Sequence, residues 1–237
     1  MSFVLKKKYG QNFLIDQNIQ KKISDLIQDE NLKILEIGPG DGKLTDKIIF
    51  KRPSSLTLIE IDKELIKILK MKYSQDNNIT IINKDILKHQ IEKDYECVIS
   101  NLPYNISSQI LVKLSTMKIM PDYLILMFQK EFAQRLLDKK LNSINSFIGC
   151  FYDMKLRFHV SKNCFRPIPK VDSSVVTFKK KNNSKLNSNE IDDFVIFKRN
   201  LFSHKRKKLK NLLKKHNLGD NFNLNLRVED LELDKLI

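Results

Sequence analysis

The stretch KILEIGPGDG, residues 33–42, decides the fold. An apolar run at 33–37 leads directly into a turn that carries Gly38, Gly40 and Gly42. A strand, a glycine-rich turn and a helix in this order are typical of an open α/β sheet, where the backbone approaches a ligand at the helix N-terminus. The spacing is G-x-G-x-G rather than the dinucleotide pattern, so the turn predicts a ligand site and disfavours a pyrophosphate cradle.

Further apolar runs extend this pattern along the chain. Strand-like segments lie at 33–37, 56–61, 79–82, 96–100 and 123–128. Segments with apolar residues at helical spacing lie between them, at 43–51, 63–72, 108–117 and 130–139. The alternation predicts a mostly parallel sheet with helices packed on its faces.

The pattern changes after about residue 145. Two long strand-like segments, 147–160 and 171–179, are joined by the connector FRPIPK, which predicts a terminal antiparallel pair. The polar stretch 179–189 is interpreted as a linker, and 190–216 as one or two basic helices. The fold class is therefore α/β, with a Rossmann-like sheet followed by a small C-terminal helical domain.

Charge is the strongest compositional signal. The 237 residues include 43 Lys and Arg against 28 Asp and Glu, a net charge of +15, and the isoelectric point is near 9.6. Such an excess favours a polyanionic partner such as nucleic acid, although part of it reflects a composition rich in Lys, Asn and Ile. A hydrophobic content of 41% is enough for one main domain with an accessory piece.

Cysteine usage and the N-terminus predict an intracellular protein. Cys97, Cys150 and Cys164 lie far apart without a C-x-x-C pair, which indicates neither a disulfide framework nor a metal site. The N-terminus has no apolar segment of signal-peptide length, and the longest apolar run, 123–128, is too short to span a bilayer. We expect a soluble cytoplasmic protein with no membrane partner and no metal.

Two carboxylates follow successive strands. Glu60 ends the second strand, roughly 20 residues beyond the glycine turn, where a carboxylate can accept both hydroxyls of an adenosine ribose. Asp85 follows the third strand and can accept from an adenine amine. Each alone is equally interpreted as a solvated loop residue or a helix cap. Their place beside the glycine turn favours binding.

The stretch CVISNLPYNISS, residues 97–108, ends the fourth strand on Asn101, Leu102, Pro103 and Tyr104. In the simplest interpretation Pro103 only bars Leu102 from helical conformation and ends the strand. However, an amide and an aromatic ring at the carboxyl end of a parallel strand lie where ligands bind in this fold class.

Taken together, these motifs resemble the S-adenosylmethionine-dependent adenine-N6 dimethyltransferases of small-subunit ribosomal RNA. The resemblance runs in order through KKKYGQNFLID (6–16), EIGPGDG, IEID, NKDIL, NLPYNISS and FRPIPKVDSSVV (165–176). It covers essentially the whole sheet domain. It implies a methyltransferase domain at 1–180 and a small basic helical domain at 190–237.

The resemblance implies a cofactor site for S-adenosyl-L-methionine. The implied binding residues are Asn12, Leu14, Gly38, Gly40, Glu60, Asp85 and Asn101. Among them, Asn12 and Leu14 close over the methionine end, Glu60 takes the ribose hydroxyls and Asp85 takes the adenine amine. The alternative for the first motif is that KKKYGQNF is a solvated tail.

The resemblance also implies how methyl transfer is catalysed. The N6 amine of adenine is a poor nucleophile because its lone pair is delocalised into the ring. If the Asn101 side-chain oxygen and the Leu102 carbonyl both accept from N6–H, the lone pair becomes localised and directed. Pro103 makes the turn rigid, and Tyr104 and Phe165 offer stacking faces to a flipped-out adenine. Alternatively, Phe165 is only a core aromatic.

The implied target is a pair of adjacent adenosines in the 3′-terminal hairpin of small-subunit (16S) rRNA, each methylated twice during ribosome biogenesis. The large-subunit dimethylases share most of these motifs, but they commonly show Ile at the position of Leu102 and Asn at that of Asp172. A DNA adenine methyltransferase and a non-catalytic ribosome-assembly factor on the same fold stay open as alternatives. The retention of Glu60, Asp85 and Asn101 argues against the assembly factor.

Three features depart from the family pattern. Ser100 stands where Gly or Ala is expected, and LNSINSFIGC (141–150) lacks the residues that are usual in the family at this point. The tail after 190 is short for the helical domain of the family. The most basic segment is 202–215, with Lys205, Arg206, Lys207 and Lys208 as the expected RNA contacts. The alternative is a solvated helix face. We expect a monomer that acts on the rRNA of the precursor small subunit.

Overall fold

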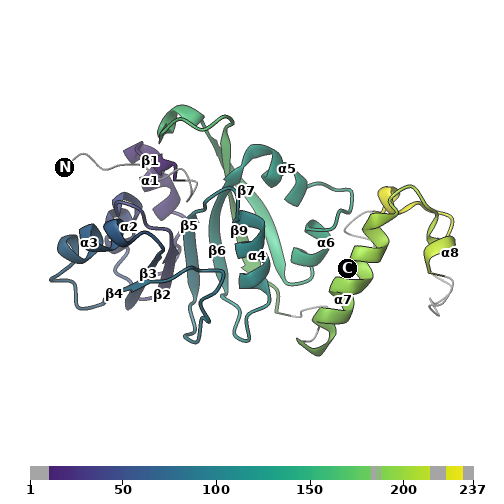
Figure 1. Ribbon diagram of the computed structural model, residues 1–237, viewed down its shortest axis with the longest axis horizontal. Coiled ribbons are helices and arrows are strands. Elements are labelled where there is room, and N and C mark those ends of the chain that lie inside the picture. The colour runs from purple at the N-terminus through teal and green to yellow at the C-terminus, as the bar shows by residue number, and fades with distance from the viewer. Residues whose placement is uncertain (1–10, 183–185, 187, 214–222, 232–237) are drawn as a thin grey trace. The chain divides into compact units, whose positions relative to one another are not determined.

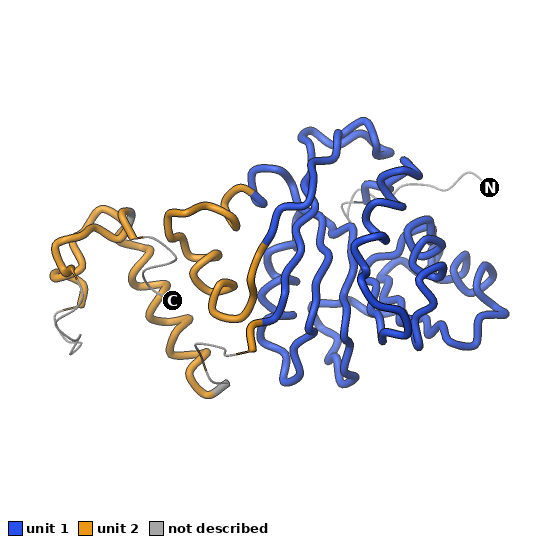
Figure 2. The backbone as a smooth tube through the Cα atoms, turned by 180° about the vertical axis from the view of Figure 1, so that it is seen from behind, with its two compact units in different colours: residues 1–133, 155–180 blue, residues 134–154, 181–237 orange. Residues whose placement is uncertain are grey.

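The computed structural model describes residues 11–182, 186, 188–213 and 223–231. The chain divides into two compact units, residues 1–133 with 155–180 and residues 134–154 with 181–237 (Figure 2). Residues 134–154 thus group with the tail, while the predicted domain ranges 1–180 and 190–237 stay a prediction.

A seven-stranded sheet forms the centre of the first unit (Figure 1). Its order is β4-β3-β2-β5-β6-β9-β7. The strands are β2 (Lys33–Ile37), β3 (Ser55–Glu60), β4 (Ile79–Asn83), β5 (Cys97–Asn101), β6 (Tyr123–Gln129), β7 (Tyr152–Val160) and β9 (Ser173–Lys180). Pairs among β2 to β6 are parallel, as predicted, and β9 is antiparallel to β6.

Helices connect the strands and cover both faces of the sheet. Those of the first unit are α1 (Gln17–Ser24), α2 (Lys43–Ile49), α3 (Lys63–Lys72), α4 (Ser107–Ser115) and α5 (Lys130–Leu136), which extends into the second unit. Ile23, Ile48 and Leu69 from the first three share a buried cluster with Ile34 and Leu56 of the sheet. The strand residues whose side chains point to the other face of the sheet are buried as well, as in parallel sheets covered on both sides.

The strand order has a topological switch point between β2 and β5. The chain leaves β2 toward β3 and leaves β5 toward β6, in opposite directions across the sheet. Connections that diverge in this way leave a crevice at the carboxyl ends of the two central strands, where ligands bind in open α/β sheets. The glycine turn and Asn101 both lie at this edge.

The predicted antiparallel pair at the end of the sheet is confirmed. Arg157 of β7 contacts Thr177 of β9, and His159 contacts Ser174, so the numbers on β9 fall as those on β7 rise. A separate two-stranded sheet pairs β1 (Phe13–Leu14) antiparallel with β8 (Phe165–Arg166). This small sheet, which the sequence did not predict, joins the first described residues to the connector between the two long strands.

The prediction of a single strand over 147–160 is wrong at its N-terminal end. Residues 145–148 form helix α6 (Asn145–Ile148), and β7 starts only at Tyr152. The cause is local, because the Asn142 side chain accepts from the N–H groups of Ile144 and Asn145 and starts a helical turn. Phe147 and Phe151, one turn apart, then pack edge to face.

The second unit is built around α7 (Ile191–Ser203), with α8 (Leu209–Leu212) after a short turn. Lys198 of α7 donates to the Ser143 carbonyl at 2.9 Å and lies 4.4 Å from the ring centroid of Phe147. Burial lowers the pKa of this lysine. The prediction of one or two helices over 190–216 thus matches α7 and α8, but the basic run 205–208 lies in the turn between them rather than on a helix. Residues 214–216 lie outside the described part of the chain.

Candidate functional site

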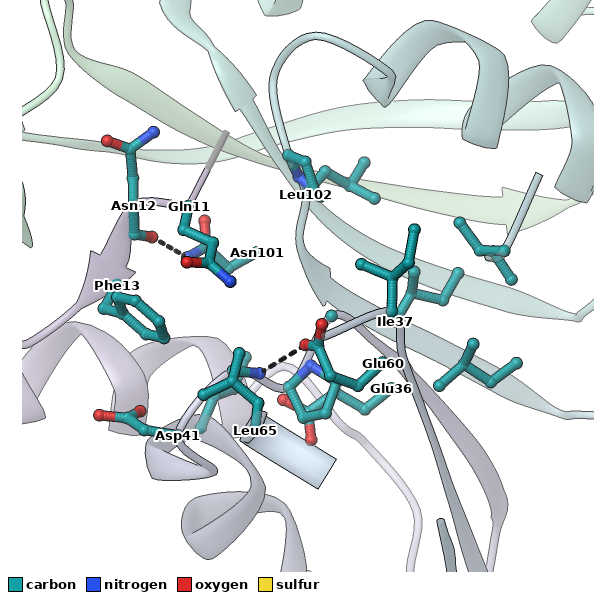
Figure 3. A pocket seen from close by; sticks show the side chains of 18 of the residues that line it. Gln11, Asn12, Phe13, Glu36, Ile37, Asp41, Glu60, Leu65, Asn101 and Leu102 are labelled. Carbon is teal, nitrogen blue, oxygen red and sulfur yellow. Dashed lines mark hydrogen bonds between the residues drawn. The ribbon is translucent and has the colours of Figure 1, made fainter. Parts of the chain in front are cut away.

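A pocket opens at the carboxyl ends of the strands on either side of the switch point (Figure 3). Its walls come from the residues after β2, β3, β4 and β5 and from residues 11–14. The predicted cofactor residues all line it, namely Asn12, Leu14, Gly38, Gly40, Glu60, Asp85 and Asn101. Leu102 and Pro103 line it as well, so the fold brings together residues that are up to 91 positions apart.

Backbone conformation explains the glycines of the turn. Gly38, Gly40 and Gly42 have φ angles of +68°, +63° and +79°, in the left-handed region that other residues rarely adopt. A Cβ on Gly40 would also lie 2.8 Å from the ring of Phe13. The turn therefore packs its backbone directly against residues 11–14, the segment that covers the pocket.

Glu60 presents its carboxylate at the end of β3, and the side chain is only 6% exposed. Its two oxygens accept from the N–H of Asp62 at 2.9 Å and from the N–H of Gly40 at 3.3 Å. Figure 3 marks the second of these bonds. Burial raises the pKa of this carboxyl, and the backbone donors oppose the shift. These donors fix the carboxylate, which retains lone pairs for the hydroxyl groups of a ligand.

A second acidic residue in the pocket, Glu36, was not predicted. It is 1% exposed and accepts a hydrogen bond of 2.6 Å from the Thr45 hydroxyl. Burial raises its pKa to about 8, so the carboxyl is mostly protonated at neutral pH. The signal in the sequence was a single acidic residue inside the apolar run KILEI.

Asp85 lines the pocket, but one of its oxygens already has a partner. That oxygen accepts from the N–H of Leu87 at 2.9 Å, as in the capping interpretation of the sequence. Because a carboxylate has two oxygens, capping and ligand binding are compatible at this residue.

The Asn101 side chain has a defined orientation. Its Nδ2 donates to the backbone carbonyl of Asn12 at 2.9 Å (Figure 3). A backbone carbonyl only accepts, so the nitrogen of the amide must face Asn12, and the side-chain oxygen is the end that is left for another donor. This is the orientation that acceptance from an adenine N6–H requires.

Tyr104 and Phe165 are not among the residues that line the pocket. The Tyr104 hydroxyl is hydrogen-bonded to Ser173 at 2.6 Å, and burial raises its pKa. Phe165 is fully buried in the core, because β8 pairs its backbone with Leu14 of β1. In this conformation the Phe165 ring presents no face to a base, and its stacking role stays a prediction.

Ser100, the residue that departs from the family pattern, has a structural role. It is 2% exposed, and its hydroxyl donates to the Ile37 carbonyl at 2.5 Å. The ladder between β2 and β5 ends at Glu36 and Ile99, one residue short of this position. The Ser100 hydroxyl therefore replaces a backbone donor where the two central strands separate at the pocket.

The basic turn of the second unit consists of Lys205, Arg206, Lys207 and Lys208, between α7 and α8. All four are exposed, and none forms an ion pair with another described residue. A run of solvated cations of this kind is able to contact phosphates.

In the ranges that the structure describes, no group of three or more His, Cys, Asp and Glu side chains is arranged to hold a metal ion. No helix in those ranges is both long and apolar enough to cross a membrane.

The parallel sheet, the glycine turn and the carboxylates at successive strand ends define an α/β methyltransferase that uses S-adenosylmethionine. The chain belongs to the ribosomal RNA adenine dimethylase family, whose model matches residues 2–234. It is 42% identical over 214 residues to the ribosomal RNA small subunit methyltransferase A of Mycoplasmopsis pulmonis, covering 88% of this chain and 83% of that relative.

Solved structures agree with the family. A dimethyladenosine transferase from Plasmodium falciparum matches with a TM-score of 0.80 and 27% identity, over 94% of both chains. The 23S rRNA methyltransferase ErmE matches with a TM-score of 0.69 and 22% identity, over 92% of this chain and 95% of its own. The second match shows a shared fold alone.

Proposed function

We propose that this protein dimethylates N6 of two adjacent adenosines in the 3′-terminal hairpin of small-subunit (16S) rRNA, during ribosome biogenesis. The observation that carries the proposal is the orientation of Asn101, whose amide nitrogen is bound by Asn12 and whose oxygen is left to accept from the target amine. It lies in one pocket with the glycine turn, Glu60 and Asp85.

The pocket residues fit the cofactor of the family. S-adenosylmethionine supplies a methyl group activated by a positively charged sulfonium. Glu60, held by two backbone donors, would accept the ribose hydroxyls, and Asp85 would accept the adenine amine. Asn12, Leu14 and Gly38 would line the methionine end, and the φ of +68° at Gly38 is a backbone conformation that favours glycine there.

Activation of the target amine falls to Asn101 and Leu102. The Asn101 oxygen and the Leu102 carbonyl accept hydrogen bonds from the two N6–H groups. These bonds draw the nitrogen lone pair out of conjugation with the ring. As the new N–C bond forms, the bond between the methyl group and the sulfonium sulfur would break, and its electrons would stay on the sulfur of the departing neutral thioether. The proton is lost to solvent afterwards, because the amine becomes strongly acidic only as it gains the methyl group. No base is needed in advance, and a neutral amide suits this role better than a carboxylate.

Binding of the RNA is assigned to the basic turn. Lys205, Arg206, Lys207 and Lys208 are exposed and would contact backbone phosphates, which supply affinity but little sequence information. Since the substrate is the rRNA of a precursor subunit, we propose that the protein acts in the cytoplasm, and as a monomer.

The choice of the small subunit rests on relatives rather than on the fold. The curated relative from Mycoplasmopsis pulmonis is named for the small subunit, whereas the fold is shared with a 23S rRNA methyltransferase. Asp172, which favoured the small-subunit branch, accepts from the N–H of Lys162 at 2.9 Å. Asn would accept equally well there, so this contact does not discriminate between the two targets.

Mapping of N6,N6-dimethyladenosine on rRNA tests the proposal. RNA from cells with and without the protein is digested and the modified fragments are assigned by mass spectrometry. We expect two adjacent dimethyladenosines near the 3′ end of 16S rRNA that vanish without the protein and return with the wild-type gene. Loss of a 23S mark instead would identify the large-subunit activity, and unchanged marks in both rRNAs would favour the assembly factor.

A further inference from the structure

Gln11 fastens the segment that crosses the pocket. Its Nε2 donates to Oδ2 of Asp62 at 3.1 Å. Asp62 is a rigid partner, because it is fully buried and its other oxygen accepts from the N–H of Glu64 at the start of α3. The bond therefore ties the segment 11–14 to the framework of the sheet, just beyond Glu60, whose carboxylate is the proposed ligand of the ribose.

The adjacent residue sets the orientation of the proposed catalytic amide. The Asn12 carbonyl accepts from Nδ2 of Asn101 at 2.9 Å. If the Asn101 amide were flipped, its oxygen would face the Asn12 carbonyl oxygen, and the two would repel each other. The Asn12 carbonyl therefore selects one orientation of the amide. Without that carbonyl, either end of the Asn101 amide can turn toward the target amine.

The downstream side of the segment is held independently. Phe13 and Leu14 pair with Arg166 and Phe165, and buried Gln20 donates to the Leu14 carbonyl at 2.7 Å. The Asn12 carbonyl thus lies between two fixed points. On one side β8 and α1 hold Phe13 and Leu14, and on the other side Gln11 contacts Asp62.

We propose that Gln11 is a positioning residue for methyl transfer, which acts by holding the Asn12 carbonyl against the Asn101 amide. The inference rests on the proposed function and deepens it. Its consequence is that covering the cofactor pocket and orienting the catalytic oxygen are a single event.

A double-mutant cycle tests the link to Asn101. Gln11→Met keeps the length of the side chain and removes the donor to Asp62. At saturating cofactor and RNA, its single-turnover rate should fall on the order of 10-fold, the scale of one lost hydrogen bond. If Gln11 acts through Asn101, the same change should cost less than about twofold in an Asn101→Ala background.

Two comparisons sharpen this test. Exposed Gln28 is the matched control, and Gln28→Met should leave the rate unchanged. Gln11→Glu keeps the length of the side chain and puts a carboxyl group in place of the amide that donates to Asp62. An ionised carboxylate only accepts, so at pH 8 this variant should lose rate as Gln11→Met does.

The outcomes separate the inference from the function on which it rests. Equal losses from Gln11→Met with and without Asn101, or an undiminished rate at saturating cofactor, would overturn the positioning role while methylation by the wild type stands. Wild-type protein that transfers no methyl group to small-subunit rRNA would overturn both.

Discussion

Removal of the Ser100 hydroxyl tests how the two central strands are held at the pocket. In Ser100→Ala the Ile37 carbonyl loses the donor that replaces the missing ladder hydrogen bond. Ile37 is 2% exposed, so its carbonyl is left buried without that partner, a loss of about 1–3 kcal/mol. For a protein of this size the melting temperature should fall by roughly 2 to 12 °C.

Ser115→Ala is the matched control. Ser115 is also fully buried, and its hydroxyl donates to the Leu111 carbonyl at 2.9 Å, one turn earlier in α4. That carbonyl belongs to the helix and has a backbone donor, so the substitution leaves no acceptor without a hydrogen bond. We expect a change within about 0.5 kcal/mol, since Ala is also the better helix former.

Urea unfolding with and without S-adenosylmethionine measures both variants. Ser100→Ala should lose stability and also bind the cofactor more weakly, because the Ile37 carbonyl directly precedes the glycine turn. Equal stability of the two variants would refute the reasoning and would make the hydroxyl irrelevant to the pocket.

Three further predictions concern the carboxylates and the basic turn. Glu60→Ala should weaken S-adenosylmethionine binding in titration calorimetry and leave RNA affinity nearly unchanged; cofactor affinity equal to the wild type would argue against the ribose assignment. Neutralising Lys205, Arg206, Lys207 and Lys208 should flatten the slope of log K against log salt by about 3, at roughly 0.7 per phosphate contact, and an unchanged slope would mean that the turn faces solvent in the complex. Glu36 has a folded pKa of about 8 against an ordinary value of 4.5; its carboxyl stabilises the fold below pH 4.5, and this contribution is lost as the pH rises toward 8. Wild type should therefore lose stability relative to Glu36→Gln between pH 5 and pH 8 in urea unfolding, and parallel curves would show that Glu36 ionises normally.

The parallel core of the fold was predictable because its signals are local and repeated. Each apolar run such as 33–37 is flanked by turn residues and followed by a helical period, and a parallel sheet needs that alternation. The helix at 145–148 was not predictable from periodicity, since it depends on the Asn142 side chain, which accepts from two backbone N–H groups and competes with strand pairing. The β1–β8 pair joins residues about 150 positions apart and has no local pattern.

The site was predictable to the level of residue types at strand ends. Glu60 and Asp85 follow strands, so the carboxyl edge of a parallel sheet brings them into one pocket. The contact of Asn101 with Asn12 could not be predicted, because it depends on the path of a segment outside the sheet. Burial of Phe165 has the same origin, since a strand of only two residues decides which way its ring points.

Single-turnover methylation by Asn101→Ala tests the central claim most directly. A hairpin RNA substrate is mixed with saturating S-adenosylmethionine, and rapid quenching resolves the first and second methyl transfers. We predict that the first rate falls on the order of 10²-fold or more, as when one preorganised hydrogen-bonding group is removed. The second should fall at least as much, because a monomethylated amine has one N–H left, while RNA affinity should barely change. Near-normal rates for both steps would contradict the account and would reduce NLPY to a turn that ends a strand.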